Sequence, residues 1–153
     1  MAASDEVFLA SDAPLADVAA RVAVALGLEH MGVVGAELQY RARGRSFDGW
    51  IGVFIGPNDH YPEPGEVQAM DRYPVLVDIQ SRRLKETQPE EARLAFEVLT
   101  RELPDVPALL SHNLEQLVAA SRPGVGMHYF GDGVWLDPPE VEPWAPWVLL
   151  GED

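Results

Sequence analysis

Residues 49–56 carry apolar side chains on both faces of an extended backbone. A strand with this pattern is typically covered on both sides, and two candidate helices are available as cover. Gly52 lies between Trp50 and Phe54 on one face, and its missing side chain leaves room for a helix or an aromatic ring to lie on the backbone. The pattern therefore predicts a central strand at residues 49–56.

Three further stretches show strand patterns, at residues 7–9, 36–45 and 73–81. Residues 36–45 alternate between an apolar and a polar face, as a half-buried strand does. The polar face carries three arginines, which we interpret as partners of neighbouring carboxylates. These are Arg41, Arg43 and Arg45. Residues 44–49 contain glycine and polar side chains and predict a hairpin turn into the central strand.

Two stretches have helical periodicity. The first covers residues 13–26, with Ser11 or Asp12 as the expected N-cap and Gly27 as the residue that ends the helix. The second begins at Thr87, where Thr-Gln-Pro-Glu matches a capping box, and ends before Pro104. Each has one apolar stripe, so both are expected to pack on the sheet.

Residues 107–121 fit two structures. Leucines at helical spacing would suit a helix, whereas two short apolar runs would suit a hairpin that turns at His112 and Asn113. We favour the hairpin, because Gly- and Pro-containing turns separate further strand-like runs at residues 127–130 and 134–136. A β-meander would then continue without a break.

The C-terminal residues, 138–153, contain four prolines, which favour extended backbone over a regular element. Trp144 and Trp147 are too apolar to stay in water, so this tail is expected to dock on its own domain or on a partner. The sequence therefore predicts one α+β domain at residues 1–137, with a mostly antiparallel sheet and two main helices packed on it. A Pro/Trp-rich extended tail at residues 138–153 follows.

Net charge and cysteine content restrict the function. The formal net charge of −14 repels nucleic-acid phosphates and anionic lipid, so neither nucleic acid nor membrane is an expected partner, and a basic protein is. The chain has no cysteine and no apolar run long enough to cross a bilayer, which favours the cytoplasm. A monomer and a homodimer are both compatible with the sequence.

The sequence offers few residues for catalysis, so we expect no enzyme activity, metal or cofactor. Its four histidines lack the spacing of a zinc site. A small enzyme or ligand-binding domain that uses His112 and His128, with Asp78, is the alternative. A structural or homo-oligomeric domain without a separate ligand is the third hypothesis.

Several segments resemble the small acidic cytosolic immunity proteins that accompany secreted bacterial toxins. They are the apolar strand that begins at Gly49, the strand at residues 73–79 followed by the Thr87 helix, and the hairpin-like residues 108–121. The resemblance covers about residues 36–137. It implies a stoichiometric inhibitor that binds and neutralises a basic toxin domain with an acidic surface.

Binding hot spots favour aromatic anchors, and acidic neighbours would steer a basic partner toward them. The long loop at residues 57–72, the turn near Gly131 and the tail combine these two features. We therefore predict a partner-binding set made of Asp59, His60, Tyr61, Glu63, Glu66, Asp132, Trp135, Trp144 and Trp147.

Overall fold

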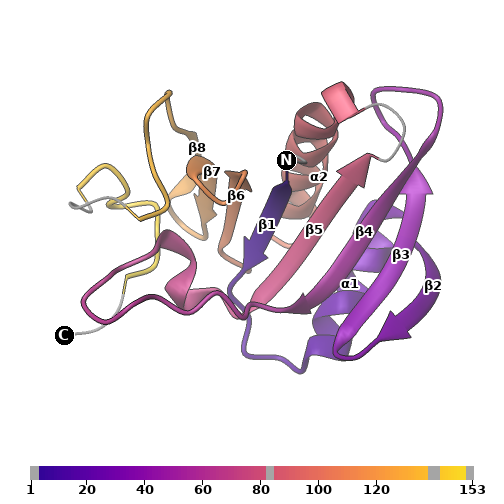
Figure 1. Cartoon of the computed structure of the whole chain (residues 1–153), viewed down its shortest axis with the longest axis horizontal. Helices are drawn as coiled ribbons and strands as arrows, with labels where there is room; N and C mark the ends of the chain where they lie inside the picture. Colours follow the sequence, from indigo (N-terminus) through magenta and orange to yellow (C-terminus); the bar gives the residue numbers. More distant parts are fainter. Residues whose placement is uncertain (1–3, 82–84, 138–141, 151–153) are drawn as a thin grey trace.

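The computed structural model describes residues 4–81, 85–137 and 142–150. In this part of the chain eight strands form one antiparallel sheet in the order β2-β3-β4-β5-β1-β6-β7-β8, and two helices lie on one of its faces (Figure 1). The predicted α+β class, with a mostly antiparallel sheet and two helices, is confirmed. The strands are β1 (Asp5–Leu9), β2 (Glu29–Val34), β3 (Glu37–Arg43), β4 (Trp50–Pro57), β5 (Val75–Ser81), β6 (Ala108–His112), β7 (Gln116–Arg122) and β8 (Gly126–Tyr129).

The helices α1 (Leu15–Leu26) and α2 (Gln88–Glu102) bury the apolar stripes that the sequence predicted. Val18 and Val22 of α1 and Phe96 and Leu99 of α2 pack on alternate residues of the sheet, where β4 contributes Ile51, Val53 and Ile55. Gly27 ends α1 in the left-handed conformation with φ 65°, as expected of a helix that stops at glycine. This layer is the main core of the protein.

The predicted N-cap of α1 is wrong, and that of α2 is right in its position but not in its capping hydrogen bond. Pro14 is the N-cap of α1, and no side chain makes a capping hydrogen bond there. Thr87 is the N-cap of α2, as predicted. A short 3-10 helix η2 (Lys85–Thr87) precedes α2, so Thr87 has helical backbone angles and its side chain makes no capping hydrogen bond. The Thr87 hydroxyl instead donates a hydrogen bond to Ser81 Oγ at 3.4 Å.

The sequence pattern missed strand β2, and it misjudged the cover of β4. Residues 29–34 form an edge strand paired with β3, although they read as a connection. Both helices lie on the same face of the sheet, so the other face of β4 has no helix over it and Trp50 remains 42% exposed. The ring of Phe54 fills the space that Gly52 leaves: a Cβ on Gly52 would lie 2.9 Å from Phe54 Cε2.

Residues 108–122 form the predicted hairpin. β6 and β7 pair in antiparallel fashion, and Asn113 and Leu114 make the turn with φ of 57° and 53°. The meander continues into β8, which pairs with β7. Beyond it, Trp135 forms a single bridge with Gln116 where a longer strand was expected.

A second core lies on the opposite face of the sheet, under the tail. Phe8 of β1, Leu109 of β6 and Leu117 of β7 point to this face and are buried there. Trp144 and Val148 of the tail cover them, together with Leu136 and with Met70 of the short 3-10 helix η1 (Ala69–Arg72). The tail thus packs on its own chain, over the half of the sheet that contains β1, β6 and β7.

Candidate functional site

Three segments that are far apart in the sequence meet at one end of the molecule: the loop 58–68, the turn 130–137 and the tail 142–150. They lie together on the left of Figure 1, and we call them the tail end. Ala69 N donates to Leu136 O at 2.7 Å, which ties the loop to the turn. Trp144 Nε1 donates to Trp135 O at 3.0 Å, and Leu149 N to Tyr73 Oη at 3.0 Å, which fixes the tail. The segments therefore form one surface.

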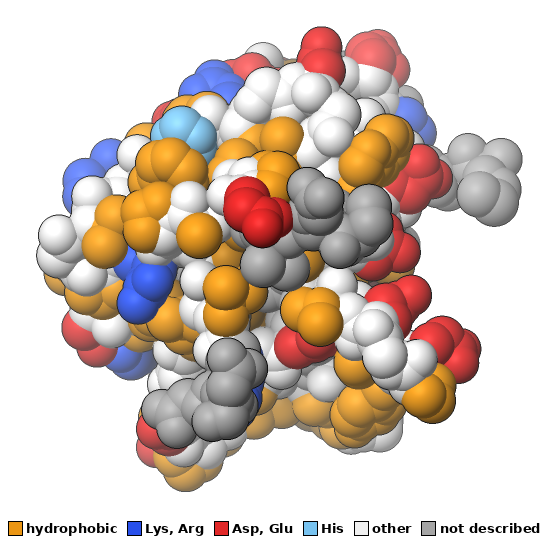
Figure 2. All heavy atoms as spheres, turned by 90° about the vertical axis from the view of Figure 1, so that its left-hand side faces the viewer, with side chains coloured by type: hydrophobic (Ala, Val, Ile, Leu, Met, Phe, Trp, Pro, Cys, Tyr) orange, Lys and Arg blue, Asp and Glu red, His pale blue; other side chains and the backbone are white. Residues whose placement is uncertain are grey.

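Carboxylates dominate the tail end. Within residues 57–72 and 113–150 the sequence has two basic side chains, Arg72 and Arg122. Arg122 donates to Pro146 O at 2.8 Å, so one of the two helps to hold the tail. Figure 2 looks onto this end and shows acidic and apolar side chains interspersed, with most of the basic ones to the left. The described carboxylates of the tail end are Asp59, Glu63, Glu66, Asp132, Asp137 and Glu142, and Asp71 and Glu115 lie outside its three segments but within the ranges 57–72 and 113–150.

Two aromatic side chains of the predicted binding set are at the surface of the tail end. Tyr61 is 82% exposed at the loop, and Trp135 is 44% exposed in the turn. Asp59 and Glu63, next to Tyr61, and Asp132, near Trp135, are exposed as well. A large exposed ring beside carboxylates is the combination that the sequence suggested for binding a basic protein.

Trp144 is not a surface residue, and its place in the predicted binding set is wrong. The side chain is fully buried in the second core, and its indole N–H is used within the chain. Trp147 is half-buried because its ring stacks on His128, with centroids 3.8 Å apart. The sheet offers an apolar face at this place, and packing on it removes the apolar surface of both rings from water. Trp144 and Trp147 therefore hold the tail against the sheet.

Two further members of the predicted set serve the loop itself. His60 is half-buried and meets the Phe8 ring edge-on at 6.3 Å. Glu66 accepts a hydrogen bond from Gln68 Nε2 at 3.1 Å. Asn58 Nδ2 donates to Met70 O and Tyr73 O at 3.0 and 2.9 Å, which holds the base of the loop. The loop is therefore fixed at its base and presents Tyr61 outward.

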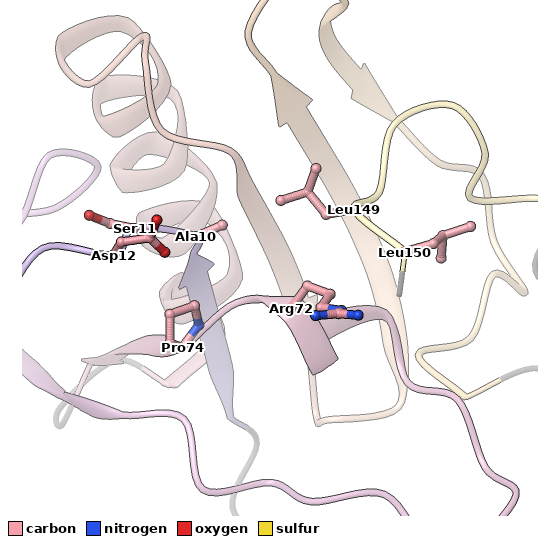
Figure 3. A pocket seen from close by; sticks show the side chains of 7 residues that line it. All are labelled: Ala10, Ser11, Asp12, Arg72, Pro74, Leu149 and Leu150. Carbon is pink, nitrogen blue, oxygen red and sulfur yellow. The ribbon is translucent and has the colours of Figure 1, made fainter. Parts of the chain in front are cut away.

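A hollow of about 430 Å³ lies beside the tail, between the residues after β1 and the last described residues (Figure 3). Ser11, Asp12 and Arg72 give it polar walls, and Leu149 and Leu150 give it an apolar one. A single Asp and a single Arg do not make an acid-base or nucleophilic set. We interpret the hollow as a surface depression at the margin of the tail end.

The two histidines of the enzyme hypothesis do not meet. His112 Nδ1 lies 2.7 Å from Asp5 Oδ1, on the face of the sheet that carries the helices. His128 is opposite Ala120, on the face covered by the tail, where it stacks on Trp147. Among the described residues, no group of three or more His, Asp or Glu is placed to hold a metal ion. The acid-base pair of the alternative hypothesis is therefore not formed.

Glu6 and Asp78 are directly opposite each other on β1 and β5, on the face without helices. Burial, together with the negative charge of Asp78, raises the pKa of Glu6 to about 7, although hydrogen bonds from Ser4 and Ser111 oppose the shift. Burial also raises the pKa of Asp78. Ionisation of both carboxylates is costly, so Glu6 favours its protonated form up to about neutral pH.

The Glu6→Gln variant is expected to gain stability over the native chain as pH rises. The pKa of Glu6 is about 7 in the folded protein against an ordinary 4.5, so between these values the folded state holds more protons than the unfolded state. The free energy of unfolding of the native chain therefore falls as the pH rises from about 4.5, and this contribution of Glu6 is lost above about pH 7. The free energy of unfolding of the variant should match that of the native chain below pH 4.5 and exceed it by roughly 3 kcal/mol at pH 8.

Urea denaturation at a series of pH values measures this difference, and Glu37→Gln, an exposed carboxylate on β3, is the control. A difference between Glu6→Gln and the native chain that does not change from pH 4 to pH 8 would show that Glu6 titrates normally.

A groove of about 910 Å³ runs over the part of the sheet that the tail leaves open. Trp50 and Phe54 of β4 and Met31 of β2 line it, together with Gly52. The predicted pairing of arginines with carboxylates is seen for two of the three: Arg41 binds Glu29 with an N–O distance of 3.2 Å, and Arg43 lies 3.8 Å from Asp48. Both guanidinium groups also stack on the Trp50 ring, at 4.2 and 4.4 Å. The Arg45 side chain instead donates to Leu26 O at 3.2 Å. Sequence reasoning missed this open-face groove because it placed a helix over Trp50. The alternate arginines of the neighbouring strand β3 were a signal that this face of the sheet is exposed to solvent.

Within the described ranges, no helix is long and apolar enough to cross a membrane. Comparisons of the chain with protein-family models, with curated proteins and with solved structures returned no match.

Proposed function

We propose that this chain is a protein-binding module that uses its tail end to bind a basic protein, as a stoichiometric inhibitor of the immunity type does. The observation that carries the proposal is the exposure of Tyr61 and Trp135 on an end of the molecule that is dense in carboxylates. Large rings provide contact area at low entropic cost, and they are enriched among the residues that dominate interface energies.

Electrostatics supports the same role. The net charge of −14 attracts a basic surface over distances of about a Debye length, roughly 8 to 10 Å at physiological salt. Two basic side chains lie near the carboxylates of the loop and turn. Arg122 is engaged with the tail, and the second is Arg72. An approaching basic protein would thus meet a negative electrostatic potential, which raises its association rate.

Rigidity is the third support. Fixing mobile loops on binding costs free energy, and this cost is smaller when the loops are held beforehand. The hydrogen bonds from Ala69 to Leu136 and from Trp144 to Trp135 hold the loop, the turn and the tail to one another before any partner arrives. The tail end is therefore suited to tight, preorganised binding.

Tyr61→Ala and Trp135→Ala are each expected to weaken partner binding by roughly tenfold or more, which corresponds to about 1.4 kcal/mol. The immobilised chain first captures its basic partner from an extract of the producing cells at low salt, and high salt elutes it. The purified partner is then titrated against each variant by calorimetry.

Trp50→Ala is the matched control, because Trp50 is 42% exposed but lies on the open face of β4, away from the tail end. It should bind the partner as the native chain does. Equal losses in all three variants, or none in Tyr61→Ala and Trp135→Ala, would contradict the proposed binding surface.

A further inference from the structure

Strand β2 is one edge of the sheet. It pairs with β3 and, within the described part of the chain, with no other strand. The backbone N–H and C=O groups on its outer side therefore face solvent, in the spacing that another strand would match. Figure 1 shows β2 at the far right of the molecule, at the opposite end from the tail.

The side chains of this edge lack the usual protection against pairing. Glu29, the first residue of β2, is paired with Arg41 of β3. The following residues 30–36, which read His-Met-Gly-Val-Val-Gly-Ala, contain no Lys, Asp, Glu or Pro, although the chain carries 25 acidic residues. Val33 is 57% exposed, and Met31 and Val34 are exposed as well. Natural edge strands are usually blocked by lysine, proline or an inward charge, and here a single bulge between His30 and Gly32 is present.

The other edge of the sheet differs. Strand β8 has four residues against six in β2. Trp147 of the tail stacks on its His128, and Tyr129 donates a hydrogen bond to Glu97 of α2. Thr100 of α2 also donates to the sulfur of Met127, so three of the four residues are engaged by other parts of the chain. Of the two edges, β2 is the longer and the more open.

We propose that β2 pairs with β2 of a second copy of this chain, in antiparallel fashion about a two-fold axis, so that the two sheets become one. Two-fold pairing brings the uncharged run 30–36 against itself, so within this run no carboxylate faces another. A basic partner would find no compensating charge in these residues, whereas a second copy finds matching apolar side chains.

The distribution of charge supports a second copy as the occupant. Two chains of net charge −14 repel each other, and the repulsion is smallest when their acidic ends are far apart. The sheet order places β2 at the end opposite to β8 and the tail. Pairing through β2 leaves both tail ends exposed at the outside of the dimer. Met31 lines the open-face groove, so the grooves of the two copies would meet beside the new strand pair.

This inference does not depend on the proposed basic partner, and salt separates the two. Added salt screens the repulsion between like-charged copies and so strengthens the dimer. The same salt weakens attraction to a basic partner at the tail end. The two associations therefore have opposite salt dependence.

The test is sedimentation velocity of the full chain over a roughly hundredfold range of concentration, at low and at high salt. We expect a particle of twice the mass of one chain whose fraction rises with both concentration and salt. Val33→Lys places a charge at the paired edge and should weaken dimerisation at least tenfold. Val24→Lys is the matched control, because Val24 is 85% exposed on α1 and should leave the dimer unchanged.

Hydrogen exchange of the native chain gives a second readout that needs no variant. The amides of β2 should exchange more slowly as concentration rises, while those of the loop 58–68 should not change. A native chain that stays monomeric at every concentration, or a Val33→Lys variant that dimerises as well as the native chain, would overturn the proposal. Protection of β2 that appears only when another protein is added would also overturn it.

Discussion

Replacement of Trp144 by alanine is expected to lower the free energy of unfolding by about 3 to 5 kcal/mol, the range found for buried tryptophan. The side chain is fully buried against Phe8, Leu109 and Leu117 of the sheet. Alanine would leave a cavity over these residues and would remove the hydrogen bond from Trp144 Nε1 to Trp135 O. The effect is large for one residue because this ring closes the second core.

Urea denaturation, followed by far-UV circular dichroism, measures the loss. Tyr61→Ala is the control, because Tyr61 is an exposed aromatic residue of the same end and its loss should cost below about 0.5 kcal/mol. Hydrogen exchange should also show faster exchange in the tail and around Trp135 in Trp144→Ala. If Trp144→Ala were as stable as Tyr61→Ala, the tail would not be an integral part of the fold.

Replacement of Glu91 by alanine is also expected to have a large effect and to lower the free energy of unfolding by about 3 kcal/mol. This carboxylate of α2 is almost fully buried and accepts hydrogen bonds from the Arg45 amide at 3.0 and 2.9 Å. It also accepts hydrogen bonds from the amide and the hydroxyl of Ser46. Without Glu91, the donors of the β3–β4 turn have no acceptor at that position, and charge-assisted hydrogen bonds of this kind are among the strongest in proteins.

Thermal and urea denaturation of three variants test this. Glu91→Gln keeps one acceptor oxygen and should lose about half as much as Glu91→Ala. Glu90→Ala, the neighbouring residue in the same turn, removes a partly exposed ion pair with Arg93 and should cost below about 1 kcal/mol. Amide exchange at Arg45 and Ser46 should quicken in Glu91→Ala alone. Similar losses in Glu90→Ala and Glu91→Ala would indicate a general effect on α2.

Sequence reasoning located the elements with strong periodicity and missed those that depend on long-range contacts. The apolar stripes of α1 and α2 and the alternation of β3 follow from local spacing, so they were predictable. The edge strand β2 was not, because Met31, Val33 and Val34 are exposed and the two glycines around them look like a connection. The anchoring of the β3–β4 turn by Glu91 joins residues more than 40 positions apart, and no local pattern indicates it.

The candidate site shows the same division. Tyr61, Trp135 and their acidic neighbours were predicted from composition and turn chemistry, and they share one end of the molecule in the structure. Trp144 looked equally suitable, because a sequence does not reveal which aromatic ring finds an apolar face to cover. The open-face groove was missed because the apolar side chains on both faces of β4 predicted that both faces are covered. Both helices lie on one face and leave the other open.

The central claim is that carboxylates at the tail end attract a basic protein. The decisive variant combines Asp59→Asn, Glu63→Gln and Asp132→Asn, and its control removes the same charge from the helical side through Asp17→Asn, Glu86→Gln and Glu102→Gln. All six side chains are exposed. Both variants should fold as the native chain does.

The most direct measurement is the association rate constant of the captured basic partner as a function of salt concentration, by stopped flow. The rate for the native chain and for the control variant should fall steeply and almost equally as salt is added, whereas the tail-end variant should associate more slowly and depend on salt less. An association rate that does not change with salt, or a control variant that slows association as much as the tail-end variant, would contradict the account.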